Sequence, residues 1–83
     1  MARYSVVWLE VAREQYDGLP GEARDHIDAR LDQLAENPRQ VPRSAYDHLT
    51  DQWTTVYGDG AGLILFALVE RPPRVIVLRL VAG

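Results

Sequence analysis

Residues 53–81 read WTTVY-GDGAG-LILFALVE-RPPR-VIVLRLV, and this stretch decides the fold of the chain. Three runs of β-branched, leucine and aromatic residues alternate with two short segments of glycine, proline and charged residues. Such runs are typical of strands, and short turns between them join antiparallel neighbours. The stretch therefore predicts an antiparallel meander with strands at 53–57, 63–70 and 75–81.

The last of these strands should have one buried and one open face, since successive side chains point to opposite sides of a strand. We expect Ile76, Leu78 and Leu80 to lie under the helices. The opposite, open face then carries Val75, Val77, Arg79 and Val81. Arg79 is thus predicted to be a lone cation in an otherwise apolar row.

The N-terminal half predicts one strand and a first helix. Residues 3–9 (RYSVVWL) are rich in β-branched and aromatic types, which favours a strand. A helix should follow over about residues 10–17. Gly18 should end it, because glycine readily takes the left-handed cap conformation.

A second helix should begin at Pro20, because the fixed φ and missing N–H of proline cost nothing at a helix start. Its apolar stripe is Ala23, Ile27, Leu31 and Leu34. The Asn37-Pro38 pair should stop it, since the residue before proline disfavours the α region. Residues 38–52 then read as a loop.

The predicted order of elements is βααβββ over a single domain of residues 1–83, which is too short for a second core. The fold class is α+β. A helical hairpin should pack on one face of a mostly antiparallel four-stranded sheet.

The chain has 83 residues and a net charge of −3, and all nine of its basic residues are arginine. An acidic chain is a poor non-specific binder of nucleic acid, because Lys and Arg neutralise the phosphates in such complexes. Without cysteine there are no disulfides or thiolate metal sites, and two distant histidines predict no metal centre. We expect no cofactor. No apolar run is long enough to span a membrane, so a cytoplasmic protein is expected.

Several short features, each weak alone, follow one another along the chain in a fixed order. They are Trp8 running into a helix at Ala12, the Leu19-Pro20 joint, a helix closed by LAENP at residues 34–38, a loop anchored by Leu49, and the Trp/Tyr, glycine and VIVLRL segments of the meander. Together they resemble the RelE/ParE superfamily of toxins from bacterial toxin–antitoxin pairs, over about residues 3–81. The resemblance implies a compact domain with helices on one face of the sheet and a functional face on the other.

The resemblance implies one reaction to look for, because RelE-like members cleave mRNA on the ribosome. That reaction needs a general base, a general acid and cationic groups at one phosphate. Residues that could substitute for the usual set are Arg79 as the cation, His48 beside Asp47 as a base near the sheet edge, and Tyr57 as a donor of a phenolic proton. Each also has a structural interpretation: an arginine that reaches solvent or an acidic antitoxin segment, a solvated loop histidine, and a packed strand tyrosine.

Nucleic-acid contacts are predicted at three further residues. Arg39 and Arg43 form a small basic patch in the 38–52 loop that suits phosphates, and Trp53 is a candidate for base stacking. Each also has a structural interpretation, as hydrated loop arginines and as a packed aromatic ring.

The chain departs from the RelE pattern where the superfamily carries basic residues. Thr54 and Thr55 stand on the second strand in place of lysine or arginine, and the third strand is apolar from Leu63 to Val69. The sequence ends at Gly83, so the His/Arg/Tyr tail of RelE-like members is expected to be absent. These departures favour binding over catalysis.

Two functions stay open at this point. The first is a RelE-like toxin that inhibits translation by ribosome-dependent mRNA cleavage, with much of the usual catalytic set missing. The second is a ParE-like inhibitor of DNA gyrase, or a degenerate module that only engages its antitoxin. Both imply a cognate antitoxin as partner, and the apolar open face also suits a homodimer.

Overall fold

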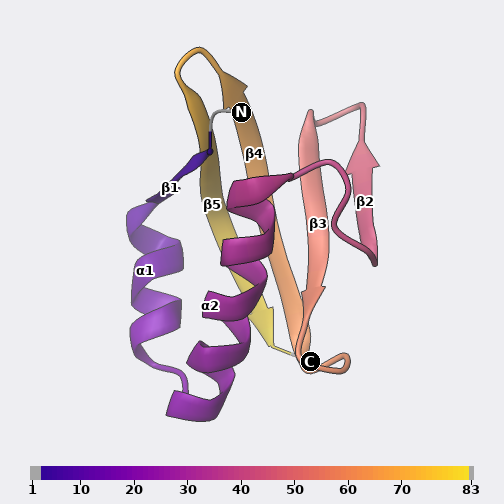
Figure 1. Ribbon diagram of the computed structural model, residues 1–83. Coiled ribbons are helices and arrows are strands. Elements are labelled where there is room, and N and C mark those ends of the chain that lie inside the picture. Colours follow the sequence, from indigo (N-terminus) through magenta and orange to yellow (C-terminus); the bar gives the residue numbers. More distant parts are fainter. Residues whose placement is uncertain (1–2, 83) are drawn as a thin grey trace.

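The computed structural model describes residues 3–82, which form two helices on one face of a five-stranded sheet (Figure 1). The elements are β1 (Ser5–Trp8), α1 (Glu10–Asp17), α2 (Gly21–Glu36), β2 (Ser44–Asp47), β3 (Gln52–Tyr57), β4 (Gly62–Glu70) and β5 (Pro73–Ala82). The sheet order is β1-β5-β4-β3-β2, with β1 parallel to β5 and the other neighbours antiparallel. The predicted α+β class, helical hairpin and meander are therefore confirmed.

The sheet has five strands where the sequence predicted four, because part of the 38–52 loop pairs with the meander. β2 runs antiparallel to β3, with Ser44 opposite Thr55. The Ser44 hydroxyl donates to the Thr55 hydroxyl oxygen at 2.8 Å, which helps to hold this register. Ser-Ala-Tyr-Asp has no strong strand propensity of its own, so the pairing depends on the edge of β3 that it meets.

An irregularity in the β4–β5 pairing changes the alternation of side chains along β5. Leu65 pairs with Arg79, but the next pair is Phe66 with Val77, so Leu78 has no partner. Such a bulge inserts one extra residue into one strand. The predicted place of Leu78 in the core row is therefore wrong.

The bulge also reverses the two faces predicted for the first half of β5. Val75 and Val77 are fully buried against the helices, whereas Ile76 lies on the opposite face and is half-buried. The prediction had these positions the other way round, because a strict period of two does not survive an extra residue. Beyond the bulge, Leu80 is buried and Arg79 is exposed, as predicted.

The helix boundaries agree closely with the sequence, and the caps differ in detail. α1 spans the predicted residues, but Gly18 has φ −84° and ψ −3°, so the predicted left-handed cap is wrong. Pro20 stands at the N-cap, one position before α2. Asn37 ends α2 with a non-helical φ of −155°, as expected before Pro38. Within residues 3–82, no helix is long and apolar enough to cross a membrane.

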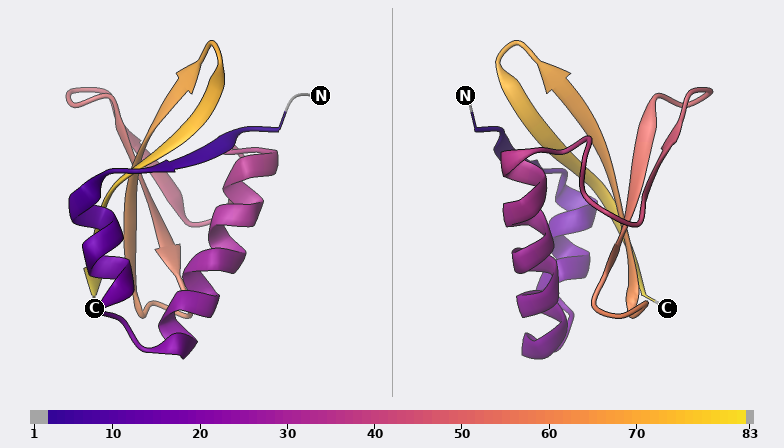
Figure 2. Two further views of the ribbon diagram at one scale, coloured as in Figure 1. Left: turned by 90° about the vertical axis from the view of Figure 1, so that its left-hand side faces the viewer. Right: turned by 45° about the vertical axis from the view of Figure 1, so that its right-hand side comes forward.

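The core fills the space between the helices and the covered face of the sheet (Figure 2). From α2, the predicted stripe residues Ile27, Leu31 and Leu34 are buried there. The sheet contributes Thr55, Tyr57, Ile64, Phe66, Val75, Val77 and Leu80. The helices therefore leave the other face of the sheet uncovered.

Gly62 is a position where the core admits no side chain. A Cβ there would lie 2.5 Å from the Tyr57 hydroxyl oxygen and would also meet the backbone carbonyl of Val81. Gly62→Ala should therefore lower the free energy of unfolding by at least about 2 kcal/mol, since a packed ring and a strand must move. Urea unfolding followed by circular dichroism measures the change.

The matched control is Gly21→Ala at the start of α2, where the added methyl group meets only Arg24, at 3.8 Å. That variant should be neutral or more stable, because alanine has the higher helix propensity. Equal stability of Gly62→Ala and the wild type would contradict the packing argument.

Candidate functional site

Two adjacent rows of the uncovered face are apolar around Arg79. Residues that pair across strands share a face, so Thr54, Leu65 and Arg79 form one row. The adjacent row is Val56, Leu63 and Val81. Leu63 and Val81 are 36% and 39% exposed, and Arg79 has no ion pair within residues 3–82. This open face is thus an apolar strip with an exposed guanidinium.

The three predicted catalytic residues lie in three separate places. Arg79 is on the open face, whereas Tyr57 points to the helix side, where its buried ring lies against Gly62. His48 is in the exposed turn between β2 and β3. These side chains therefore do not converge on one phosphate position.

Trp53 connects the core to the outer hairpin. Its ring stacks on Phe66 with the ring centroids 6.1 Å apart, and it tilts against Tyr46 at 5.0 Å. The Tyr46 hydroxyl donates to Asp51 at 2.6 Å, and this bond raises the pKa of Tyr46. Trp53 is half-buried and Tyr46 is exposed, so Tyr46 has the more accessible ring of the pair.

Arg39 belongs to an ion-pair network at the β4–β5 end of the sheet. Its guanidinium pairs with Glu70 and donates to the Tyr4 hydroxyl oxygen at 3.1 Å. The Tyr4 hydroxyl in turn donates to Glu70 at 2.5 Å. The bond from Tyr4, and then that from Arg39, lowers the pKa of Glu70, and the bond to Glu70 raises the pKa of Arg39. The network ties the loop after α2 to the end of β4.

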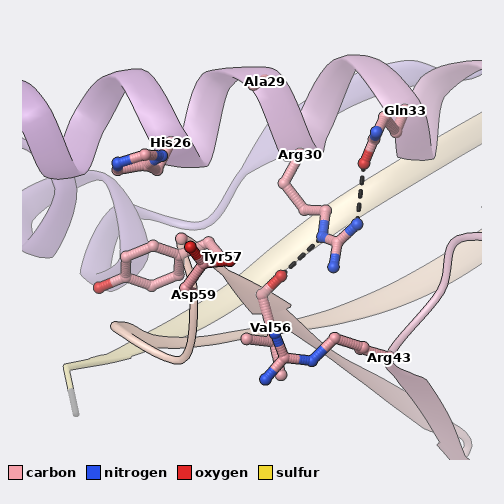
Figure 3. Close-up of a pocket in the computed structure, with 9 residues that line it drawn as sticks. His26, Ala29, Arg30, Gln33, Arg43, Val56, Tyr57 and Asp59 are labelled. Carbon is pink, nitrogen blue, oxygen red and sulfur yellow. Dashed lines mark hydrogen bonds between the residues drawn. The ribbon is translucent and has the colours of Figure 1, made fainter.

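A groove of about 310 Å³ between α2 and the β3–β4 turn brings together two predicted residues, Arg43 and Tyr57 (Figure 3). Its other polar lining residues are His26, Arg30, Gln33 and Asp59. Arg43 comes from the residue before β2, where the backbone is left-handed with a φ of 59°. Among residues 3–82, no three His, Asp or Glu side chains are placed to hold a metal ion. Within the described residues, the groove therefore offers cationic and polar side chains and no set of metal ligands.

Arg30 is the most strongly held of the groove residues that sequence reasoning missed. Its Nε donates to the Val56 carbonyl at 2.6 Å, and its Nη1 donates to the Gln33 side-chain oxygen at 2.8 Å. Arg30 lies three residues after Ile27 and one before Leu31, so it borders the buried stripe of α2. Next to the stripe, the hydrocarbon part of the Arg30 side chain lies toward the sheet. This position beside the apolar stripe is the signal in the sequence that could have indicated Arg30.

Comparison with known proteins identifies the fold. No protein-family model and no curated protein matches the chain. Among solved structures, a chain of the intact Escherichia coli RelBE toxin–antitoxin complex superposes with a TM-score of 0.82 at 15% identity, covering 96% of each chain. A chain of the RelBE2 complex from Mycobacterium tuberculosis gives 0.80 at 19% identity, over 100% of this chain and 94% of that one.

A YoeB/ParE toxin from Agrobacterium tumefaciens gives a TM-score of 0.81 at 9% identity, over 95% of this chain and 98% of that one. The isolated RelE toxin of E. coli also matches, with a TM-score of 0.82 at 14% identity, over 96% of this chain and 84% of that one. The chain therefore has the fold of the RelE/ParE toxins, which confirms the resemblance seen in the sequence. RelE and ParE names both occur among the matches, and one fold can host several activities.

The Arg39–Glu70–Tyr4 network predicts a specific pH dependence of stability. Glu70 has its ordinary pKa of 4.5 in the unfolded chain and a lower pKa in the fold. Its stabilisation is therefore fully present above pH 4.5 and is lost as the pH falls through the lowered value. In Glu70→Gln, the urea midpoint of unfolding should be lower than in the wild type at neutral pH. It should also fall less steeply than the wild-type midpoint as the pH is lowered through this acidic range.

The control for this measurement is Glu22→Gln, an exposed carboxylate in the first turn of α2 that forms no ion pair within residues 3–82. Glu22→Gln should keep the wild-type slope. Parallel pH profiles for Glu70→Gln and the wild type would show that the network does not stabilise the fold.

Proposed function

We propose that this chain is the toxin of a toxin–antitoxin pair, held inactive by a cognate antitoxin in the cytoplasm and released to inhibit a cellular target. The observation that carries the proposal is the end-to-end likeness to known toxins. It reaches a TM-score of 0.82 over 96% of both chains for the E. coli complex and 0.81 over 95% and 98% for the YoeB/ParE toxin. A likeness of nearly the whole of both chains supports a shared role for the whole domain.

An antitoxin is the partner that the comparisons support. Four of the matched structures are complexes of a toxin with an antitoxin or an antitoxin peptide, including an archaeal RelE–RelB complex from Pyrococcus horikoshii. The open face suits such a partner, because Val7, Leu63 and Val81 are 36–39% exposed there. Exposed apolar surface of this kind marks an interaction site. In the free chain a homodimer through the same face would cover the same side chains.

We infer that the released toxin acts by binding, as a ParE-like inhibitor of DNA gyrase. The alternative is a degenerate module that engages only its antitoxin, and such a module would bind the antitoxin without arresting growth. Cleavage of RNA requires a base, an acid and a cation within reach of one phosphate. Arg79, His48 and Tyr57 occupy the open face, the hairpin turn and the core. The row that holds Arg79 offers Thr54 and Leu65, neither of which serves as a base.

RelE-like, ribosome-dependent mRNA cleavage is the second candidate, and one observation favours it. Arg79 is exposed and has no ion pair within residues 3–82, so its guanidinium is free to meet a phosphate. In this mechanism Arg79 stabilises the charge of the transition state, and the proton transfers fall to ribosomal groups, because His48 and Tyr57 lie away from Arg79. Arg39, Arg43 and Trp53 are then the RNA contacts.

Induced expression of the chain in bacteria should arrest growth, and co-expression of an adjacent short reading frame should restore it. If the chain acts by binding gyrase, primer extension on total RNA should show intact mRNA. The supercoiling activity of gyrase should fall in the same cells. Leu63→Asp should abolish the arrest. In the complex with the partner, the new carboxylate would be buried and unpaired. This should weaken partner binding by at least about tenfold.

Leu49→Asp is the matched control, because Leu49 is 84% exposed in the β2–β3 turn and should tolerate the charge. Cleaved mRNA that becomes intact in Arg79→Ala would contradict the binding mode and establish the nuclease. A chain that neither arrests growth nor binds the product of the adjacent frame would overturn the toxin proposal itself.

A further inference from the structure

The groove between α2 and the β3–β4 turn has an excess of positive groups on the helix side of the sheet. Arg30 and Arg43 line it, against one carboxylate from Asp59. The chain as a whole carries a net charge of −3, so this local balance runs against the average composition. Among its lining residues the groove shares only Val56 with the rows of the open face.

The Arg30 guanidinium is held in place before any ligand arrives. Its bonds to the Val56 carbonyl at 2.6 Å and to Gln33 at 2.8 Å use Nε and Nη1. The second terminal nitrogen makes neither bond and points toward the side of the groove from which Arg43 enters (Figure 3). Because the side chain is half-buried and already ordered, it loses little further entropy on binding an anion.

Arg43 reaches the same groove from the opposite wall. One of its terminal nitrogens lies 3.9 Å from the position of a Cβ on Gly60, so the guanidinium sits beside the β3–β4 turn. Neither Arg43 nor Asp59 forms an ion pair within residues 3–82, although both line the groove. The charge of Arg43 is therefore available to a ligand.

His26 lies beside the two arginines in the groove. It lies one helical turn before Arg30 on the same side of α2. Its ring carbons are 3.6 Å from the position of a Cβ on Gly58, so the ring lies close to the start of the turn (Figure 3). An imidazole nitrogen there adds a further donor to those of the two arginines.

We propose that this groove binds a phosphate monoester or inorganic phosphate, with Arg30 and Arg43 as the principal contacts. Two guanidinium groups on separate elements match a dianion, and their planar donors suit phosphate oxygens. A volume of about 310 Å³ lies at the small end of ligand pockets and has room for a phosphate with part of its attached group. The polar side chains of the groove lie outside the rows of the open face, so the site stands whether or not the chain is a toxin.

The test is an NMR titration of the full chain, at constant ionic strength, with inorganic phosphate, adenosine monophosphate, adenosine and acetate. Phosphate and adenosine monophosphate should produce saturable amide shifts at Gly58, Asp59 and Arg43, and adenosine should produce none. Tighter binding of the mononucleotide identifies a nucleotide as the source of the phosphate. Equal affinity identifies free phosphate, and either result upholds the site.

Arg43→Gln should weaken phosphate binding by at least about tenfold, because a charge-assisted hydrogen bond is lost. Asp59→Asn should tighten it, since the carboxylate that lines the groove is removed. Arg71→Gln, in the exposed β4–β5 turn, is the matched control and should bind as the wild type does. Shifts that do not saturate, wild-type affinity in Arg43→Gln, or acetate binding as tightly as phosphate would overturn the proposal.

Discussion

The rest of the structure depends on the parallel pairing of β1 with β5, which joins the first and last strands of the chain. Val6 lies opposite Val75 and Trp8 opposite Val77, so both strands contribute to the same buried face. A tight turn cannot join parallel neighbours, and the chain passes from one to the other through both helices and the meander. The N–H of Leu9 donates to the Val77 carbonyl at 3.0 Å, which carries the pairing to the start of α1.

Beyond Val77, β1 no longer pairs with β5, and the side chain of Gln15 forms hydrogen bonds to the backbone of β5 instead. The Gln15 amide donates to the Leu80 carbonyl and accepts from the Leu80 N–H, both at 2.8 Å. One residue of α1 thus satisfies two backbone groups on a sheet edge that would otherwise be open to pairing with another chain. In this part of β5, which follows the bulge at Leu78, Leu80 is buried on the helix side of the sheet and Arg79 is exposed on the open face.

The sheet separates two surfaces of different chemistry. The open face carries apolar side chains around Arg79, which suits burial by a protein, and the helix side carries the groove of Arg30 and Arg43. Sequence reasoning placed Arg79 correctly, because Arg79 lies beyond the bulge, in the part of β5 where the predicted alternation holds. It named Arg43 and Tyr57 for different roles and did not predict that they line one groove, since the loop and β3 meet there only through the fold.

The sequence by itself determined the α+β class, the meander, the extent of both helices and the likeness to RelE/ParE toxins. These follow from local preferences, such as apolar runs between glycine and proline turns and the stop at Asn37-Pro38. The tertiary structure alone decided that β2 joins the sheet, that Val77 rather than Ile76 faces the core, and that Arg30 turns into the groove. The physical reason is that strand register, bulges and the convergence of side chains depend on contacts between distant segments, which no local pattern encodes.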